Sequence, residues 1–314
     1  MDLYLNNFTA KMNLHPLKIE KFKGKAHYEG KQLILENFSG IMGRSDFLVQ
    51  MSYNFDTLQE NKLKPNYFHL TSNALDLDQL MNYSNDNTTK PHSESYNVFT
   101  VPFPNIDIKT KIGKLNYHKY WLQEVSSTLR LTKNHYIYID TMAMKVAKGY
   151  LQMSGYFNGS NPDNIYYHST IYTQNLDIDK LLFKFDYLNS DQLVNNTLHG
   201  KISGTIKSTF KMHPDFTPII DKSKAHMDLT ITDGTLVNFS PMQALSKYFK
   251  DKNLNKIRFD TLKNVLEIDN GVIYIPRMNI NSSLGYMELS GRQKIDMSME
   301  YFIRIPLKMV TKLS

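Results

Sequence analysis

The sequence predicts an all-β protein in which long antiparallel strands form a curled, groove-like sheet from repeated β units, with a few short helices. Three observations predict it: apolar and polar residues alternate over long stretches, chain-breaking residues are scarce, and the same motifs recur along the chain. The 314 residues include only 14 glycines and 11 prolines, fewer than in an average protein. Long uninterrupted elements are therefore expected.

Alternation is clearest in three segments of the C-terminal third, 201–212, 225–232 and 295–305. Apolar residues there recur at alternate positions and most of their neighbours are polar, with Phe302 as the exception in the last segment. Strands of this length span about 35 to 40 Å, roughly twice the usual length. A curled sheet would leave their apolar face open to a ligand, and flexible methionines suit a disordered acyl chain. The predicted groove residues are Ile202, Ile206, Phe210, Met212, Met227, Leu229, Ile231, Ile295, Met297, Met299 and Ile303.

Further strands are expected where β-branched and aromatic residues gather. They cover 32–38, 46–55, 66–72, 125–131, 135–145, 150–157 and 165–175.

One helix is expected near 241–251. Ser240 can cap it, Pro241 suits its first position, and Gln243 would complete a capping box. Lysines late in this segment suit the negative end of the helix dipole.

Two motifs repeat at nearly the same spacing. Leu75–Met81 reads LDLDQLM and returns as LDIDKLL over 176–182, while the Gln50-Met51-Ser52 triplet returns as Gln152-Met153-Ser154. The alternative is that strands of one sheet simply share a composition.

Repetition predicts a first β unit over 1–90, a second over 97–200, and a C-terminal region over 201–314. The polar stretch 84–95 reads as the linker between the first two, and 213–218 as a break between long strands.

Composition excludes several classes of protein. The absence of cysteine removes disulfides, thiol catalysis and zinc–thiolate sites. The net charge of +7 comes from scattered lysines rather than a basic block, so nucleic acid is not an expected partner. No apolar run is long enough to span a membrane as a helix, and the first residues do not resemble a secretory signal.

Signatures of catalysis are also missing, and no enzymatic activity, metal or cofactor is expected. The sequence holds no GxSxG, GxxxxGK[ST], HExxH or dinucleotide fingerprint, and its ten histidines are dispersed. The aspartate pairs Asp76/Asp78 and Asp177/Asp179 could act as acid and base. Because aspartate before a short apolar helical turn is a typical N-cap, we interpret them as caps.

The C-terminal third carries an ordered series of short segments. It begins with Thr232–Met242, read TDGTLVNFSPM, and continues with LSKYF over 245–249 and NGVIYIP over 270–276. SSLGYMELSG over 282–291 and RIPL over 304–307 close it. This series resembles the C-terminal region of AsmA-like proteins, over roughly 225–310.

The resemblance implies the projecting β-rich body of such a protein, in the periplasm of a Gram-negative bacterium and associated with the inner membrane through an anchor that this chain does not show. AsmA-like proteins are grouped with the repeating β-groove, bridge-like lipid transfer proteins. The resemblance therefore implies phospholipid as the partner and envelope proteins as further partners. It also implies a role in lipid transport and in outer-membrane assembly and homeostasis.

Two alternatives stay open. In a closed β-scaffold that aids envelope assembly, the same apolar face would be covered by protein. In an outer-membrane barrel, long alternating strands would face lipid, but the internal capped helix and the irregular interruptions speak against it.

Overall fold

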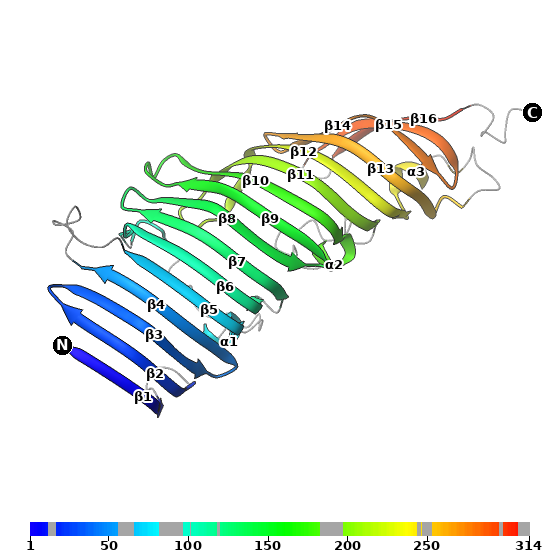
Figure 1. Ribbon diagram of the computed structural model, residues 1–314. Helices are drawn as coiled ribbons and strands as arrows, with labels where there is room; N and C mark the ends of the chain where they lie inside the picture. Colours follow the sequence, from blue (N-terminus) through cyan, green and yellow to red (C-terminus); the bar gives the residue numbers. More distant parts are fainter. Residues whose placement is uncertain are drawn as a thin grey trace, which may run out of the picture. The chain divides into compact units, whose positions relative to one another are not determined.

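Sixteen strands make up almost all of the regular structure in the described part of the chain. A computed structural model of the chain describes residues 1–11, 17–55, 66–81, 97–100, 102–117, 120–182, 197–243, 246, 253–294 and 298–306. The strands belong to one sheet and follow one another in it in the order in which they occur along the chain (Figure 1). The predicted fold class, an all-β protein with long and mostly antiparallel strands and a few short helices, is confirmed.

The elements are bounded as follows: β1 Asp2–Lys11, β2 Lys18–Glu29, β3 Gln32–Met42, β4 Ser45–Asn54, β5 Tyr67–Asp76, α1 Leu77–Leu80, β6 Ile106–Tyr117, β7 Tyr120–Thr132, β8 Tyr136–Val146, β9 Gly149–Asn158, β10 Ile165–Asp177, α2 Ile178–Leu182, β11 Leu198–Met212, β12 Pro218–Val237, α3 Ser240–Gln243, β13 Lys256–Asp269, β14 Val272–Ser282, β15 Gly285–Lys294 and β16 Met299–Arg304. The longest, β12, has 20 residues.

Each strand predicted from alternation lies within or across an observed one. The segment 201–212 falls inside β11, and 225–232 falls inside β12. Of 295–305, the residues 295–297 lie outside the described part, and β16 covers the centre of the remainder. The break predicted at 213–218 is a turn in which the amide of His213 donates to the carbonyl of Thr217. The linker predicted at 84–95 lies outside the described residues.

Bulges interrupt the first three strands, and this explains why β1 and β2 escape detection by alternation. Register shifts follow Leu5 in β1, Glu20 in β2 and Leu35 in β3. A residue with positive φ stands at each shift: Asn7 at 55°, Lys21 at 55° and Asn37 at 49°. A bulge adds one residue to a strand, so the two-residue period changes phase halfway along it.

The repeated motif folds in the same way at both places. Asp76 ends β5 and its Oδ1 accepts a hydrogen bond of 3.0 Å from the amide of Gln79 in α1. Asp177 ends β10 and accepts one of 3.3 Å from the amide of Lys180 in α2. The N-cap interpretation is therefore confirmed for Asp76 and Asp177, whereas Asp78 and Asp179 lie inside the helical turns.

A basic residue from a preceding hairpin turn reaches each cap. Arg44, between β3 and β4, lies 2.7 Å from Asp76, and Lys148, between β8 and β9, lies 3.2 Å from Asp177. Five strands, β1 to β5, lead to the first capped turn, and five more, β6 to β10, lead to the second. After the first capped turn, β5 and β6 pair in parallel, whereas pairs such as β6 and β7 are antiparallel.

The chain divides into two compact units. One comprises 1–145, 152–165 and 214–216; the other comprises 146–151, 166–213 and 217–314. The threefold division at 90 and 200 predicted from the repeats stays a prediction.

The second unit holds a packed apolar core. Its centre includes Ile257, Phe259, Ile280 and Met287, each at most 4% exposed. Gly234 faces Phe259 across β12 and β13, and a Cβ at this glycine would lie 2.0 Å from the phenyl ring. A bare backbone is therefore needed here for the ring to enter the core.

The helix predicted near 241–251 is described only at its start, as α3. The amide nitrogen of the Gln243 side chain donates to the carbonyl of Leu254 at 2.8 Å, and the backbone amide of Gln243 donates to the carbonyl of Phe239. The side chain of Gln243 thus connects the helix start to the segment before β13. In a capping box it would instead bond back to the helix N-terminus. The rest of the predicted helix, apart from residue 246, lies outside the described residues.

Candidate functional site

One face of the first unit carries an unbroken row of apolar residues. A single row crosses β1 to β8 by direct strand pairing and contains one residue from each strand: Leu3, Ala26, Leu35, Met51, Phe68, Ile108, Leu129 and Ile139. At about 4.8 Å between neighbouring strands, the row is roughly 34 Å long. We call it the apolar row.

Several residues beside the apolar row are also apolar, although the neighbouring pair in β6 and β7, Thr110 and Ser127, is polar. Val49 pairs with Leu70 on one side of it, and Leu131 pairs with Ile137 on the other. Toward the bulges, Phe22 packs edge-on against Phe47, with ring centroids 5.1 Å apart. The face therefore extends several residues along the strands.

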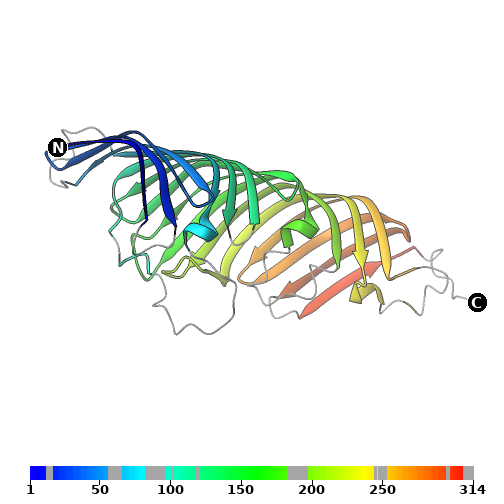
Figure 2. The same cartoon turned by 90° about the horizontal axis from the view of Figure 1, so that it is seen from below.

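Little covers this face among the described residues. The strands belong to one sheet, and the only helix described in the first unit is the four-residue α1, at the end of β5 (Figure 2). Leu3 is 44% exposed, and the other members of the apolar row are half-buried. An apolar face with this exposure can accept an apolar ligand.

The opposite face of the same strands is polar. Displaced by one residue from the apolar row, Asp2, His27, Ile34 and Ser52 form a cross-strand row. His27 hydrogen-bonds Asp2 through Nδ1 and lies 3.2 Å from Glu29 through Nε2. The hydrogen bond with Asp2, and to a smaller extent that with Glu29, raises the pKa of His27. The same bond with His27 lowers the pKa of Asp2.

A second feature of the polar face is the carboxylate of Asp46 in β4. It accepts hydrogen bonds from the amides of Asn73 and Ala74, the latter at 2.8 Å, and from the Asn73 side chain at 3.0 Å. Burial alone would raise the pKa of Asp46, but these hydrogen bonds outweigh it, and the pKa lies below its ordinary value.

We expect Asp46 to make the stability of the first unit depend on acidity. Because the folded pKa is lower than the unfolded value of about 3.9, the stabilisation is full above that value and is lost as the pH falls through the folded pKa. The Asp46→Asn variant should therefore show a flatter decline of unfolding free energy between about pH 5 and pH 2 than the unchanged protein. Urea unfolding at a series of pH values measures this, and parallel declines in the two proteins would contradict it.

The residues predicted to line a groove lie on one face of β11 and β12 in the second unit. Ile202 pairs with Ile231, and Ile206 pairs with Met227. Leu229 pairs with Gly204 between them. Phe210 and Met212 follow near a register shift after Thr209, and both are half-buried.

The remaining predicted residues belong to the C-terminal strand. Ile303 pairs with Leu289, and Met299 pairs with Gln293 and is 37% exposed. Ile295 and Met297 lie outside the described residues.

Three of the predicted residues belong to the packed core of the second unit. Ile231 is 9% exposed, and Ile202 and Ile303 pack against the same core. Ile206, Met227 and Leu229 lie farther along the strands and are half-buried. The structure therefore brings the predicted residues onto a common face but divides them between a core and a less covered stretch.

Sequence reasoning missed the apolar row of the first unit. Its signal is present in β3 and β4, where Leu33, Leu35, Val49 and Met51 alternate with other residues. Ile34 and Leu48, on the polar face, obscure it, as do the bulges in β1 to β3.

The described part of the chain has neither a cluster of metal-ligating side chains nor a helix that could span a membrane. No group of three or more histidine, aspartate or glutamate residues is placed there to hold a metal. None of its helices has the length and apolarity that crossing a membrane requires. The Asp76 and Asp177 carboxylates are engaged as caps.

Comparisons with models of protein families, with curated proteins and with solved structures found no match to this chain.

Proposed function

We propose that the protein binds the acyl chains of phospholipids on the apolar face of its sheet. The observation that carries the proposal is the apolar row, which runs unbroken across eight strands and has no second sheet against it among the described residues. Because the backbone of each inner strand is hydrogen-bonded on both sides, the face offers a lipid only side chains.

Such binding needs no directional contacts and no catalysis. Each acyl methylene removed from water contributes about 0.8 kcal/mol. Successive strands in the row present similar apolar surfaces, so a lipid can move from strand to strand without a large barrier. We therefore propose a binding and transport module rather than an enzyme.

The biological setting in this proposal comes from the AsmA-like resemblance of the C-terminal third. We propose a periplasmic body of an AsmA-like protein, attached to the inner membrane outside this chain and supporting lipid transport and outer-membrane assembly. The five-strand repeats, each ending in a capped turn, are compatible with a repeating β-groove protein.

One observation favours a second candidate, a closed β-scaffold without lipid transfer. In the second unit the same type of apolar face contributes Ile202, Ile231 and Ile303 to a packed core. If such cores predominate, the strands serve assembly with other envelope proteins rather than lipid binding.

Native mass spectrometry separates the two candidates. The chain would be expressed in a Gram-negative bacterium, purified without detergent, and analysed intact and after lipid extraction. We expect phospholipid at a defined stoichiometry, because an uncovered apolar row would acquire lipid during expression. A folded chain free of lipid would reject lipid binding and favour the scaffold.

A further inference from the structure

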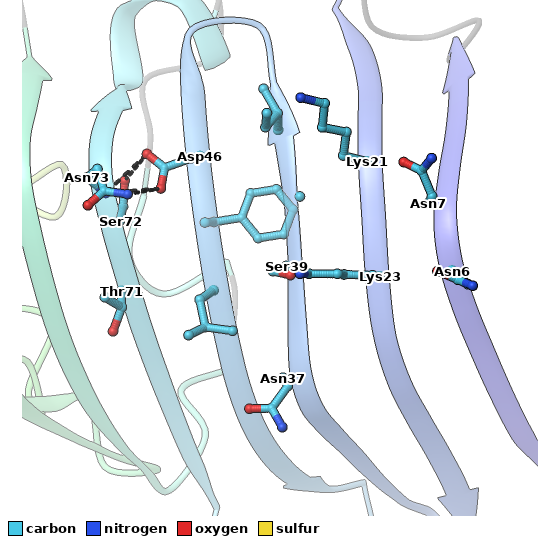
Figure 3. A pocket seen from close by; sticks show the side chains of 14 residues that line it. Asn6, Asn7, Lys21, Lys23, Asn37, Ser39, Asp46, Thr71, Ser72 and Asn73 are labelled. Carbon is cyan, nitrogen blue, oxygen red and sulfur yellow. Dashed lines mark hydrogen bonds between the residues drawn. The ribbon is translucent and has the colours of Figure 1, made fainter.

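A polar pocket lies on the face opposite the apolar row, at the bulges of the first unit. Its volume is about 710 Å³, and it spans β1 to β5 (Figure 3). Ser39, Leu48 and Thr71 form a cross-strand row along it, and this row alternates with the residues of the apolar face. The pocket therefore lies mainly on the polar face, although Phe47, which lies beside the apolar row, also lines it.

Two lysines of β2 enter this pocket. Figure 3 shows Lys21 and Lys23 reaching from β2 toward β3. Among the residues that the structure describes, neither ammonium group has an ion-pair or hydrogen-bond partner. Residues two apart on a strand are about 7 Å apart, so two flexible lysines can meet at one small anion.

Among the described residues that line the pocket, Asp46 is the one carboxylate, and it does not compete for these lysines. Asp46 is engaged by the backbone and side chain of Asn73 and by the amide of Ala74 in β5. Its two oxygens are thus directed to the adjacent strand, as the dashed lines in Figure 3 show. The pocket keeps an excess of positive charge.

Amide side chains surround the lysines. Asn6 and Asn7 of β1 and Asn37 of β3 line the pocket, and two of these three, together with Lys21, hold positive φ angles at the bulges. Bulges redirect side chains away from the regular alternation. Here they bring amide donors and acceptors to the same hollow as the two cations.

We propose that this pocket binds a phosphate ester that carries hydroxyl groups, with Lys21 and Lys23 holding the phosphate and the asparagines holding the hydroxyls. Lysine suits phosphate as a point charge, and asparagine can donate to and accept from a hydroxyl group. The phosphate ester can be a free metabolite or the headgroup of a lipid.

Isothermal titration calorimetry at low salt tests this with sn-glycerol 3-phosphate as the probe and glycerol as the neutral comparison. We expect the phosphate ester to bind and glycerol not to bind, and added salt to weaken the binding. The Lys21→Gln/Lys23→Gln variant should bind at least tenfold more weakly. The matched control is Lys109→Gln/Lys111→Gln, which removes two exposed lysines of β6 in the same unit, and it should bind as the unchanged protein does.

A second probe, dihexanoyl phosphatidylglycerol, distinguishes the sources. Tighter binding than glycerol 3-phosphate, lost in the Lys21/Lys23 variant, assigns the pocket to a lipid headgroup, and equal binding assigns it to a free ester. No binding of either probe, or equal weakening in both double variants, would overturn the proposal. Lipid co-purification with the Lys21/Lys23 variant is measured in parallel, so failure of this site is distinguishable from failure of the apolar face.

Discussion

The Leu35→Asp variant should lose most of the phospholipid that co-purifies with the unchanged protein. Leu35 lies inside the apolar row, between Ala26 of β2 and Met51 of β4. Replacing it removes an apolar contact of about 1.5–3 kcal/mol and places a carboxylate against the acyl chain. At about 1.4 kcal/mol per factor of ten, we expect a tenfold to hundredfold drop in bound lipid per protein by native mass spectrometry.

Ile34→Asp is the matched control for this variant. Ile34 is the neighbouring residue of the same strand, is also half-buried, and pairs with His27 and Ser52 on the polar face. It should leave lipid loading close to that of the unchanged protein. Equal loss in both variants would show that strand damage, and not the apolar row, governs lipid content; thermal unfolding of each variant checks that both stay folded.

The Phe259→Ala variant should strongly destabilise the second unit. Phe259 is 3% exposed in the packed core, and its ring fills the space over Gly234. Loss of a buried phenyl ring costs about 3–5 kcal/mol, since apolar contact is lost and a cavity is left. Urea unfolding followed by circular dichroism should show this decrease.

Phe302→Ala provides the comparison. Phe302 lies in β16 of the same unit but is 63% exposed, so its truncation should change the unfolding free energy by no more than about 0.5 kcal/mol. A small effect at Phe259 would contradict the packed core and would return this part of the face to the lipid-binding candidate.

Much of the fold could be predicted because one face of each long strand is apolar. In β11 and β12 the alternation is regular enough to give both the strands and the residues that share a face. The Asp76 and Asp177 caps were predictable because capping is local and depends on a few residues. β1 and β2 were not predicted, since their bulges change the phase of the alternation.

The candidate site was less predictable. Alternation places Ile202 and Ile206 on one face, but it does not reveal that Ile202 packs against a core while Ile206 lies outside it. That difference depends on contacts with β13 to β16, far away in the sequence. The pocket around Lys21 and Lys23 could not be predicted from the sequence either, because its residues come from five strands and their positions depend on bulges.

The sheet follows the order of the chain, and this has a consequence for how it forms and opens. Each strand pairs with its sequence neighbours, mostly across short turns, and longer connections join β4 to β5, β5 to β6 and β12 to β13. Contacts that are local in sequence form quickly and resemble a one-dimensional array. Strands can therefore add one after another during synthesis. Amide hydrogen exchange should be fastest in the outermost strands and should become slower from each strand to the next one inward.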